Sequence, residues 1–77
     1  MTNEKILETL ASIIAEKIDT DASEIKAETT FEELGIDSLD LTDIAMSVED
    51  AFSIEVEVSQ DLKSVGDLVN LVASLTA

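Results

Sequence analysis

The sequence lacks several residue types, and their absence limits the chemistry and structure available to the chain. It contains no Cys, His, Pro, Trp or Tyr, and its four basic residues are all Lys. Without Cys, the chain has no disulfide and no thiol of its own. Without His, it lacks the most common general base near neutral pH, which argues against a self-contained hydrolase built on Ser. The absence of Pro, with only two Gly, favours helices.

Positive charge is also scarce. Eighteen Asp and Glu residues against four Lys give a formal net charge of −14. Nucleic-acid binding requires basic surface, so the composition argues against it, and it disfavours an anionic membrane for the same reason. Proteins with basic patches are the expected partners, attracted by electrostatic forces that salt weakens. The alternative is that the acids serve only solubility, and composition does not separate the two.

The length of 77 residues predicts one domain, residues 1–77. Apolar residues make up 45% of the chain, nearly all aliphatic, which is enough for a compact core. No apolar run is long enough to cross a membrane, and the N-terminus lacks the features of a signal peptide. We therefore expect a cytoplasmic protein, with no membrane contact. Nothing in the pattern suggests an oligomer interface, so a monomer is expected.

The apolar spacing predicts three main helices. The first runs from about residue 3 to residue 17, capped by Thr2 or Asn3. The second covers residues 38–52, with Asp37 as its N-cap. The third begins after Ser64, where Asp67 completes a near relative of the capping box. The core-facing residues of the second and third helices are predicted to be Leu41, Ile44, Ala45, Val48, Phe52, Val65, Leu68, Val69, Val72 and Leu75.

The connections between these helices are less regular. Residues 19–37 form a long loop, held to the core by Ile25, Phe31 and Leu34, with a helical turn at 30–34. Residues 54–58 alternate like a strand, but a single strand has no partner, so an extended connection is expected. A short helical turn is expected at 59–63. The predicted fold is all-α, a small four-helix bundle with three main helices, a short third helix and a long loop between helices one and two.

The second helix has an unusual outer face. Rotation by about 100° per residue places two large apolar side chains among acids on the side away from the core. Such a pair is better explained as a small docking surface than as chance exposure. The residues of this face and its flanks are Asp37, Leu39, Asp40, Asp43, Met46, Glu49 and Asp50.

Ser38 lies in the first turn of this helix, just after the turn allowed by Gly35. Free backbone N–H groups and the positive end of the helix dipole make this position favourable for an anion. A nucleophilic role would need a base within reach, and the chain offers neither a His nor a Lys near Ser38 in sequence. Modification of Ser38 is therefore the better interpretation.

No metal site is predicted. Asp19, Asp21 and Ser23 have the first spacings of a calcium-binding EF-hand loop. Glu24 stands where that loop requires Gly, and Thr30 stands where it requires Glu, so the match fails.

The run Asp37-Ser38-Leu39, with Leu34-Gly35 before it and an acidic helix after it, resembles the attachment site of acyl carrier proteins. The resemblance covers almost the whole chain and includes the later run 49–52. It implies that Ser38 carries 4′-phosphopantetheine through a phosphodiester, attached by a separate transferase that uses coenzyme A. Acyl groups would be carried on the arm as thioesters, and the chain itself would catalyse nothing.

The resemblance also implies partners. They are the phosphopantetheinyl transferase, malonyl transacylase, ketosynthases and other fatty-acid synthesis enzymes, whose basic patches would meet the outer face of the second helix. Family members can also shelter an acyl chain inside the bundle. A carrier for a polyketide or another specialised acyl pathway is the alternative within the family, and Asp37 argues against a peptidyl carrier, which commonly has His before its Ser. Outside the family, the alternative is a small acidic interaction protein, in which Ser38 only begins a helix.

Overall fold

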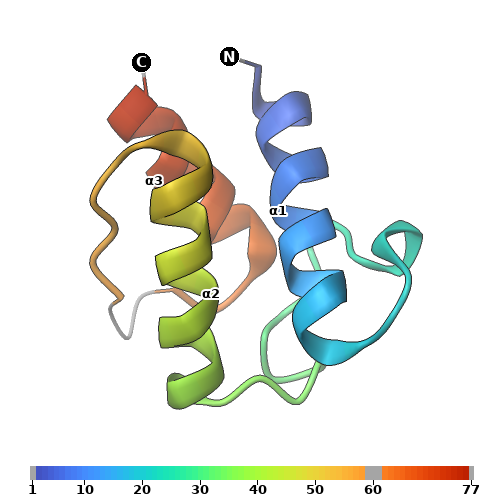
Figure 1. Cartoon of the computed structure of the whole chain (residues 1–77). Coiled ribbons are helices and arrows are strands. Elements are labelled where there is room, and N and C mark those ends of the chain that lie inside the picture. The colour runs from blue at the N-terminus through green and yellow to red at the C-terminus, as the bar shows by residue number, and fades with distance from the viewer. Residues whose placement is uncertain (1, 59–61, 77) are drawn as a thin grey trace.

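The computed structural model describes residues 2–58 and 62–76. Its elements are α1 (Asn3–Ile18), the short 3-10 helix η1 (Ala22–Glu24), α2 (Ser38–Phe52) and α3 (Val65–Thr76) (Figure 1). The described residues form no strand, which confirms the predicted all-α fold. No helix in this part of the chain is both long and apolar enough to cross a membrane.

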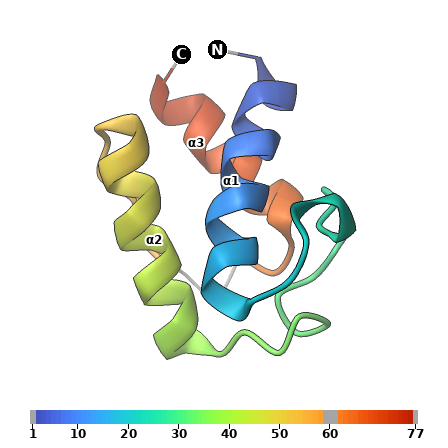
Figure 2. The ribbon, with the colours of Figure 1, turned by 45° about the vertical axis from the view of Figure 1, so that its right-hand side comes forward.

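Helix α1 is central to the packing, because it contacts α2, α3 and η1. Helices α1 and α2 run in opposite directions, and the two termini lie together at the end of the molecule where α2 finishes (Figures 1 and 2). The first turn of α2 lies at the opposite end, where the long loop from α1 arrives. The molecule therefore presents the start of α2 away from both chain ends.

The core is aliphatic and draws on all three α-helices and on the long loop. The largest fully buried side chains are those of Ile6, Leu10, Ile14, Ile44, Val48, Val65, Leu68 and Val72. Ile25 and Phe31 of the loop are also buried, while Leu34 is half-buried, so the predicted attachment of the loop to the core is confirmed. These contacts remove apolar surface from water, which is the main force that stabilises a domain of this size.

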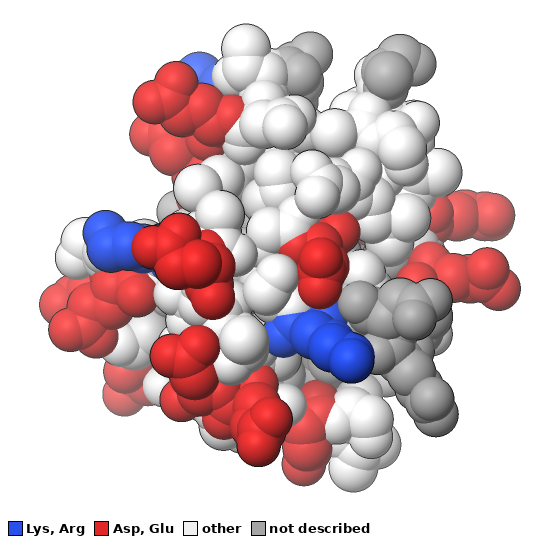
Figure 3. Space-filling view, turned by 180° about the vertical axis from the view of Figure 1, so that it is seen from behind, with Lys and Arg blue, Asp and Glu red and all other residues white. Residues whose placement is uncertain are grey.

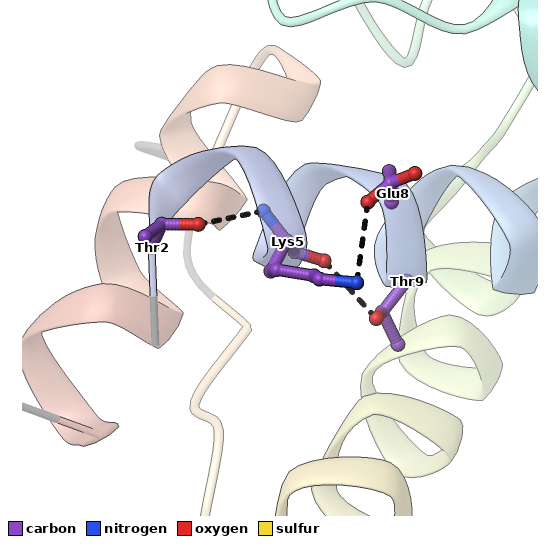
Figure 4. Close-up of polar contacts among 4 residues, drawn as sticks. All are labelled: Thr2, Lys5, Glu8 and Thr9. Atoms are coloured by element: carbon purple, nitrogen blue, oxygen red, sulfur yellow. Dashed lines mark hydrogen bonds and ion pairs between the residues drawn. The ribbon is translucent and has the colours of Figure 1, made fainter.

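Helix α1 begins directly after its N-cap residue, Thr2. The Thr2 hydroxyl accepts a hydrogen bond from the Lys5 N–H at 3.2 Å, and Lys5 also forms a 4.0 Å ion pair with Glu8 (Figure 4). Because that pair is solvent-exposed, it contributes little to stability. The Thr9 hydroxyl donates to the Lys5 carbonyl at 3.1 Å.

Helices α1 and α2 end in the same way, on a residue in the left-handed region. Asp19 has φ 57° and Ser53 has φ 55°, values that favour Gly or Asn. The following N–H then turns back toward the helix, from Thr20 to the Ala15 carbonyl at 2.9 Å and from Ile54 to the Glu49 carbonyl at 3.1 Å. The sequence gives little sign of these endings, because neither residue is Gly.

The long loop is held to the start of α3 by backbone hydrogen bonds. The Phe31 N–H donates to the Lys63 carbonyl at 2.9 Å, and the Val65 N–H donates to the Thr29 carbonyl at 2.9 Å. The Gly66 N–H donates to the Ala27 carbonyl at 2.8 Å. The Cα of Gly66 lies so close to the Ala27 backbone that an added Cβ would be 2.9 Å from the Ala27 carbonyl oxygen. Gly66 is therefore required by a close approach of two backbones.

Replacing Gly66 by Ala is expected to destabilise the fold. The clash is with backbone atoms, and overpacking of this kind typically costs about 1–3 kcal/mol. The better helix propensity of Ala returns up to about 1 kcal/mol, so a net loss of roughly 1 kcal/mol is expected. Urea unfolding measures the difference, and Asn70→Ala, at an exposed position of the same helix, is the control. Equal or higher stability of Gly66→Ala would mean that the loop moves away from α3 without cost.

The predicted capping arrangement at the start of α3 is confirmed. The Asp67 N–H donates to the Ser64 hydroxyl at 3.2 Å, and the Asp67 carboxylate accepts the N–H groups of Lys63 and Ser64, both at 3.1 Å. These bonds lower the pKa of Asp67 below its ordinary value, because they favour the charged carboxylate. The bond from the Lys63 N–H has the largest effect.

This lowered pKa predicts a pH-dependent contribution to stability. Since the folded-state pKa of Asp67 lies below the unfolded-state value of about 4, the contribution is present above that value and is lost as pH falls through the folded-state pKa. Asp67→Asn should therefore be less stable than the wild type at neutral pH, and the gap should narrow on acidification below about pH 4. Urea unfolding across this range measures the gap, with the exposed Asp50→Asn as control. A gap that stays constant down to the lowest pH would contradict the prediction.

Three details of individual elements were not predicted correctly or fall outside the described residues. The short helix predicted at 59–63 falls mostly on residues 59–61, outside the described residues, and Leu62 and Lys63 are not helical. Leu75 was expected in the core and is 44% exposed, because the buried stripe of α3 ends at Val72. The short helix η1 was not predicted, since its three residues carry no helical periodicity.

Candidate functional site

The start of α2 is built by Asp37. Its backbone is extended, and its carboxylate accepts the Asp40 N–H at 2.9 Å, which is the N-cap bond predicted from the sequence. Its carbonyl accepts the Leu41 N–H at 2.9 Å. Gly35, with φ 72°, ends the preceding turn, in which the Ile36 N–H donates to the Phe31 carbonyl at 2.9 Å. The loop and the cap together define where the helix begins.

Ser38 is the first residue of α2, and its side chain is exposed. The hydroxyl forms no hydrogen bond with any residue that the structure describes, while the Ser38 carbonyl accepts the Thr42 hydroxyl at 2.8 Å. The first N–H groups of any helix lack partners in a preceding turn, so those of Ser38 and Leu39 remain available beside the hydroxyl. The position combines an accessible oxygen with a favourable environment for an anionic group.

An apolar hollow of about 760 Å³ opens next to Ser38. It lies between the first turn of α2, the end of the long loop, and the residues Val58, Leu62 and Lys63. Its apolar lining is Phe31, Ile36, Leu41, Val58 and Leu62. Sequence periodicity alone does not find this hollow, because its walls come from segments far apart in the chain.

The outer face of α2 has the character that rotation predicted. Leu39 is 77% exposed and Met46 is 61% exposed, although both are large and apolar. Asp43 and Asp50 are exposed on the same face, one helical turn after each of them. Asp37 is also exposed, and Asp40 is half-buried. We name the set Asp37, Leu39, Asp40, Asp43, Met46 and Asp50 the α2 acidic face.

Glu49 differs from the other acids predicted for this surface. Its side chain is half-buried, and its carboxylate accepts the Val56 N–H at 2.8 Å. The two residues are seven positions apart, so no helical spacing signals the contact.

Acidic side chains are also spread over the side of the molecule that faces away from the viewer in Figure 1, where Lys side chains are few (Figure 3). Within residues 2–58 and 62–76, however, no group of three or more Asp or Glu side chains is arranged to hold a metal ion. Among the described elements, the site is therefore best characterised by the accessible Ser38 hydroxyl, the apolar hollow beside it and the α2 acidic face.

Comparison with known proteins agrees with this arrangement. A family model described as "Phosphopantetheine attachment site" matches residues 8–72, a span that contains Ser38 and all of α2. Acyl carrier proteins of two strains of Streptococcus pneumoniae are each 48% identical to this chain over 64 residues, which is 83% of this chain and 86% of the relative. The acyl carrier protein of Streptococcus thermophilus is 44% identical over 71 residues, which is 92% of this chain and 96% of the relative.

Proposed function

Since this chain belongs to the acyl carrier protein family, we propose that Ser38 is the residue to which its 4′-phosphopantetheine arm is attached. The observation that carries the proposal is the exposed Ser38 hydroxyl at the start of α2, which forms no hydrogen bond with the described residues. A phosphodiester formed on that oxygen lies beside the N–H groups of Ser38 and Leu39, where the helix dipole favours negative charge. The capping carboxylate of Asp37 is occupied by the Asp40 N–H, which holds the helix start in place.

The arm supplies, when attached, a terminal thiol on which acyl groups are carried as thioesters. This chain has no Cys and no other thiol, so that chemistry depends on the arm. The relatives are named acyl carrier proteins, and we propose that this chain is likewise a carrier and not a catalyst. The chain's own contribution is to hold the attachment oxygen at an accessible, capped helix start and to present it to other proteins.

The α2 acidic face is the proposed surface for those partners. Its acids surround the exposed Leu39 and Met46. These two side chains would contact apolar surface of a partner, while the carboxylates would pair with its basic side chains. Glu49 lies at the edge of this face. The proposed partners are the phosphopantetheinyl transferase, malonyl transacylase, ketosynthases and other fatty-acid synthesis enzymes, in the cytoplasm.

The hollow beside Ser38 suits an aliphatic chain. Leu41, Val58 and Leu62 provide apolar walls, and burial of each CH₂ group against such walls is worth about 0.8 kcal/mol. We propose that acyl groups carried by the protein are sheltered there from water, and then leave the hollow when a partner docks on α2.

Mass spectrometry of the intact protein tests the proposed function. The protein is incubated with coenzyme A and a phosphopantetheinyl transferase of broad specificity, and its mass is measured before and after. We expect the gain of one phosphopantetheinyl group per chain. Failure of the wild-type protein to gain mass, while a known carrier in the same mixture is modified, would contradict the proposal.

A further inference from the structure

Residues 54–58 follow α2 without regular secondary structure and lead toward the hollow. Within the described chain, two hydrogen bonds hold its N–H groups, and Glu49 accepts both of them. The Glu49 carbonyl accepts the Ile54 N–H at 3.1 Å, and the Glu49 carboxylate accepts the Val56 N–H at 2.8 Å. The first of these bonds would persist with any side chain at position 49, whereas the second depends on the carboxylate.

The carboxylate of Glu49 acts at the point where the segment enters the core. The Val56 side chain is 9% exposed, and Val58, two residues later, lines the hollow together with Ser38 and Leu41. Val58 is 37% exposed, so it forms an outer part of the wall of the hollow. The bond to the Val56 N–H holds the backbone only two residues before Val58 and therefore limits where Val58 can lie.

Asp50 is a natural comparison for Glu49. It is the next residue in the chain and carries the same charge, but its side chain is exposed and forms no hydrogen bond with the described residues. If an acid here acted only through long-range charge, the two residues would be equivalent. The contact with Val56 makes Glu49 different, because its oxygen is used inside the molecule.

We propose that Glu49 is a positioning residue for the acyl-binding hollow. Its carboxylate holds the 54–58 segment against α2, keeps Val58 in the wall of the hollow and thereby determines how well a thioester-linked acyl chain is sheltered. This inference rests on the proposed function of Ser38 as the attachment residue. It assigns to Glu49 a role inside the protein that is separate from contact with partners.

The first test uses the protein without an arm. Glu49→Met keeps the length of the side chain and removes the acceptor, whereas Glu49→Gln removes the charge and keeps an oxygen that can accept. Amide hydrogen exchange at Val56, measured by NMR, should accelerate about tenfold or more in Glu49→Met, as expected for loss of a bond to a charged group. It should accelerate by only about threefold in Glu49→Gln, because a neutral acceptor forms the weaker bond. Asp50→Asn should leave this amide unchanged.

The second test uses the same variants loaded with an octanoyl-phosphopantetheine arm from octanoyl-coenzyme A. In the wild type, Asp50→Asn and Glu49→Gln, the octanoyl group should raise the unfolding midpoint relative to the arm alone. In Glu49→Met this increase should fall by at least half. If Glu49→Met fails to fold, Glu49→Gln still tests the proposal. Glu49→Gln keeps an acceptor, so a fall by half or more in its octanoyl-dependent rise in unfolding midpoint would contradict the need for an acceptor at position 49.

The outcomes separate this inference from the proposed function. If no variant and no wild-type protein accepts an arm, the proposed function fails. If all of them are loaded but Glu49→Met matches Asp50→Asn in Val56 exchange and in the octanoyl increase, the positioning role is overturned and the attachment role of Ser38 stands. The same holds if the octanoyl group leaves the wild-type midpoint unchanged.

Discussion

Ser38→Ala is expected to abolish attachment of phosphopantetheine, so that the intact mass remains unchanged after incubation with coenzyme A and a transferase. The reason is chemical, because Ala has no oxygen on which the phosphodiester could form. The fold should persist, since the Ser38 side chain is exposed and forms no hydrogen bond with the described residues. The helix cap should also persist, since it is provided by the carboxylate of Asp37.

Ser47→Ala is the matched control for this experiment. Ser47 lies in the same helix, is half-buried and belongs to neither the hollow beside Ser38 nor the α2 acidic face. This variant should gain one phosphopantetheinyl group, as the wild type does. Modification of Ser38→Ala at a rate similar to that of the wild type would show that another hydroxyl accepts the arm.

Reversing two charges of the α2 acidic face should slow recognition by partners. In the double variant Asp40→Lys with Asp43→Lys, the net charge changes by four units close to Ser38 and Leu39. Electrostatic steering raises association rates far above those of neutral surfaces, so we expect transferase modification to slow by roughly 10- to 100-fold at low ionic strength. The Debye length shortens to about 3 Å at 1 M salt, so the difference from the wild type should largely disappear there.

A second double variant separates the local effect from the change in total charge. Glu16→Lys with Glu28→Lys changes the net charge by the same amount at exposed positions outside α2. We expect this control to be affected by less than about threefold, because screening limits the reach of distant surface charges. Equal slowing by both double variants would mean that net charge, and not the α2 acidic face, steers the partners. Slowing of the first variant that salt does not reduce would point to loss of a direct contact.

The features that the sequence predicted correctly depend on residues close together in the chain. Asp37 caps α2 because its carboxylate needs only to reach an N–H three residues later. Ser64 and Asp67 form their reciprocal bonds for the same reason. The exposed positions of Leu39 and Met46 follow from helical periodicity once the core stripe of α2 is known.

The features that the sequence left open depend on contacts between distant segments. The requirement for Gly at position 66 comes from the approach of the Ala27 carbonyl, almost forty residues earlier in the chain. The exposure of Leu75 depends on which segments pack against the last turn of α3. The left-handed backbone of Asp19 and Ser53 is one of many conformations that Asp and Ser can adopt. Local propensity contains no information about these distances.

Ser38 itself shows how the two levels combine. The sequence by itself determined that Ser38 begins an acidic helix in a chain without His or Cys, because caps, periodicity and composition are local or additive properties. Only the tertiary structure decided that an apolar hollow lies beside that Ser and that Glu49 is tied to Val56 and not simply exposed. Both are produced by the packing of the 54–58 segment and the long loop against α2, and packing between separate segments is what a linear pattern does not specify.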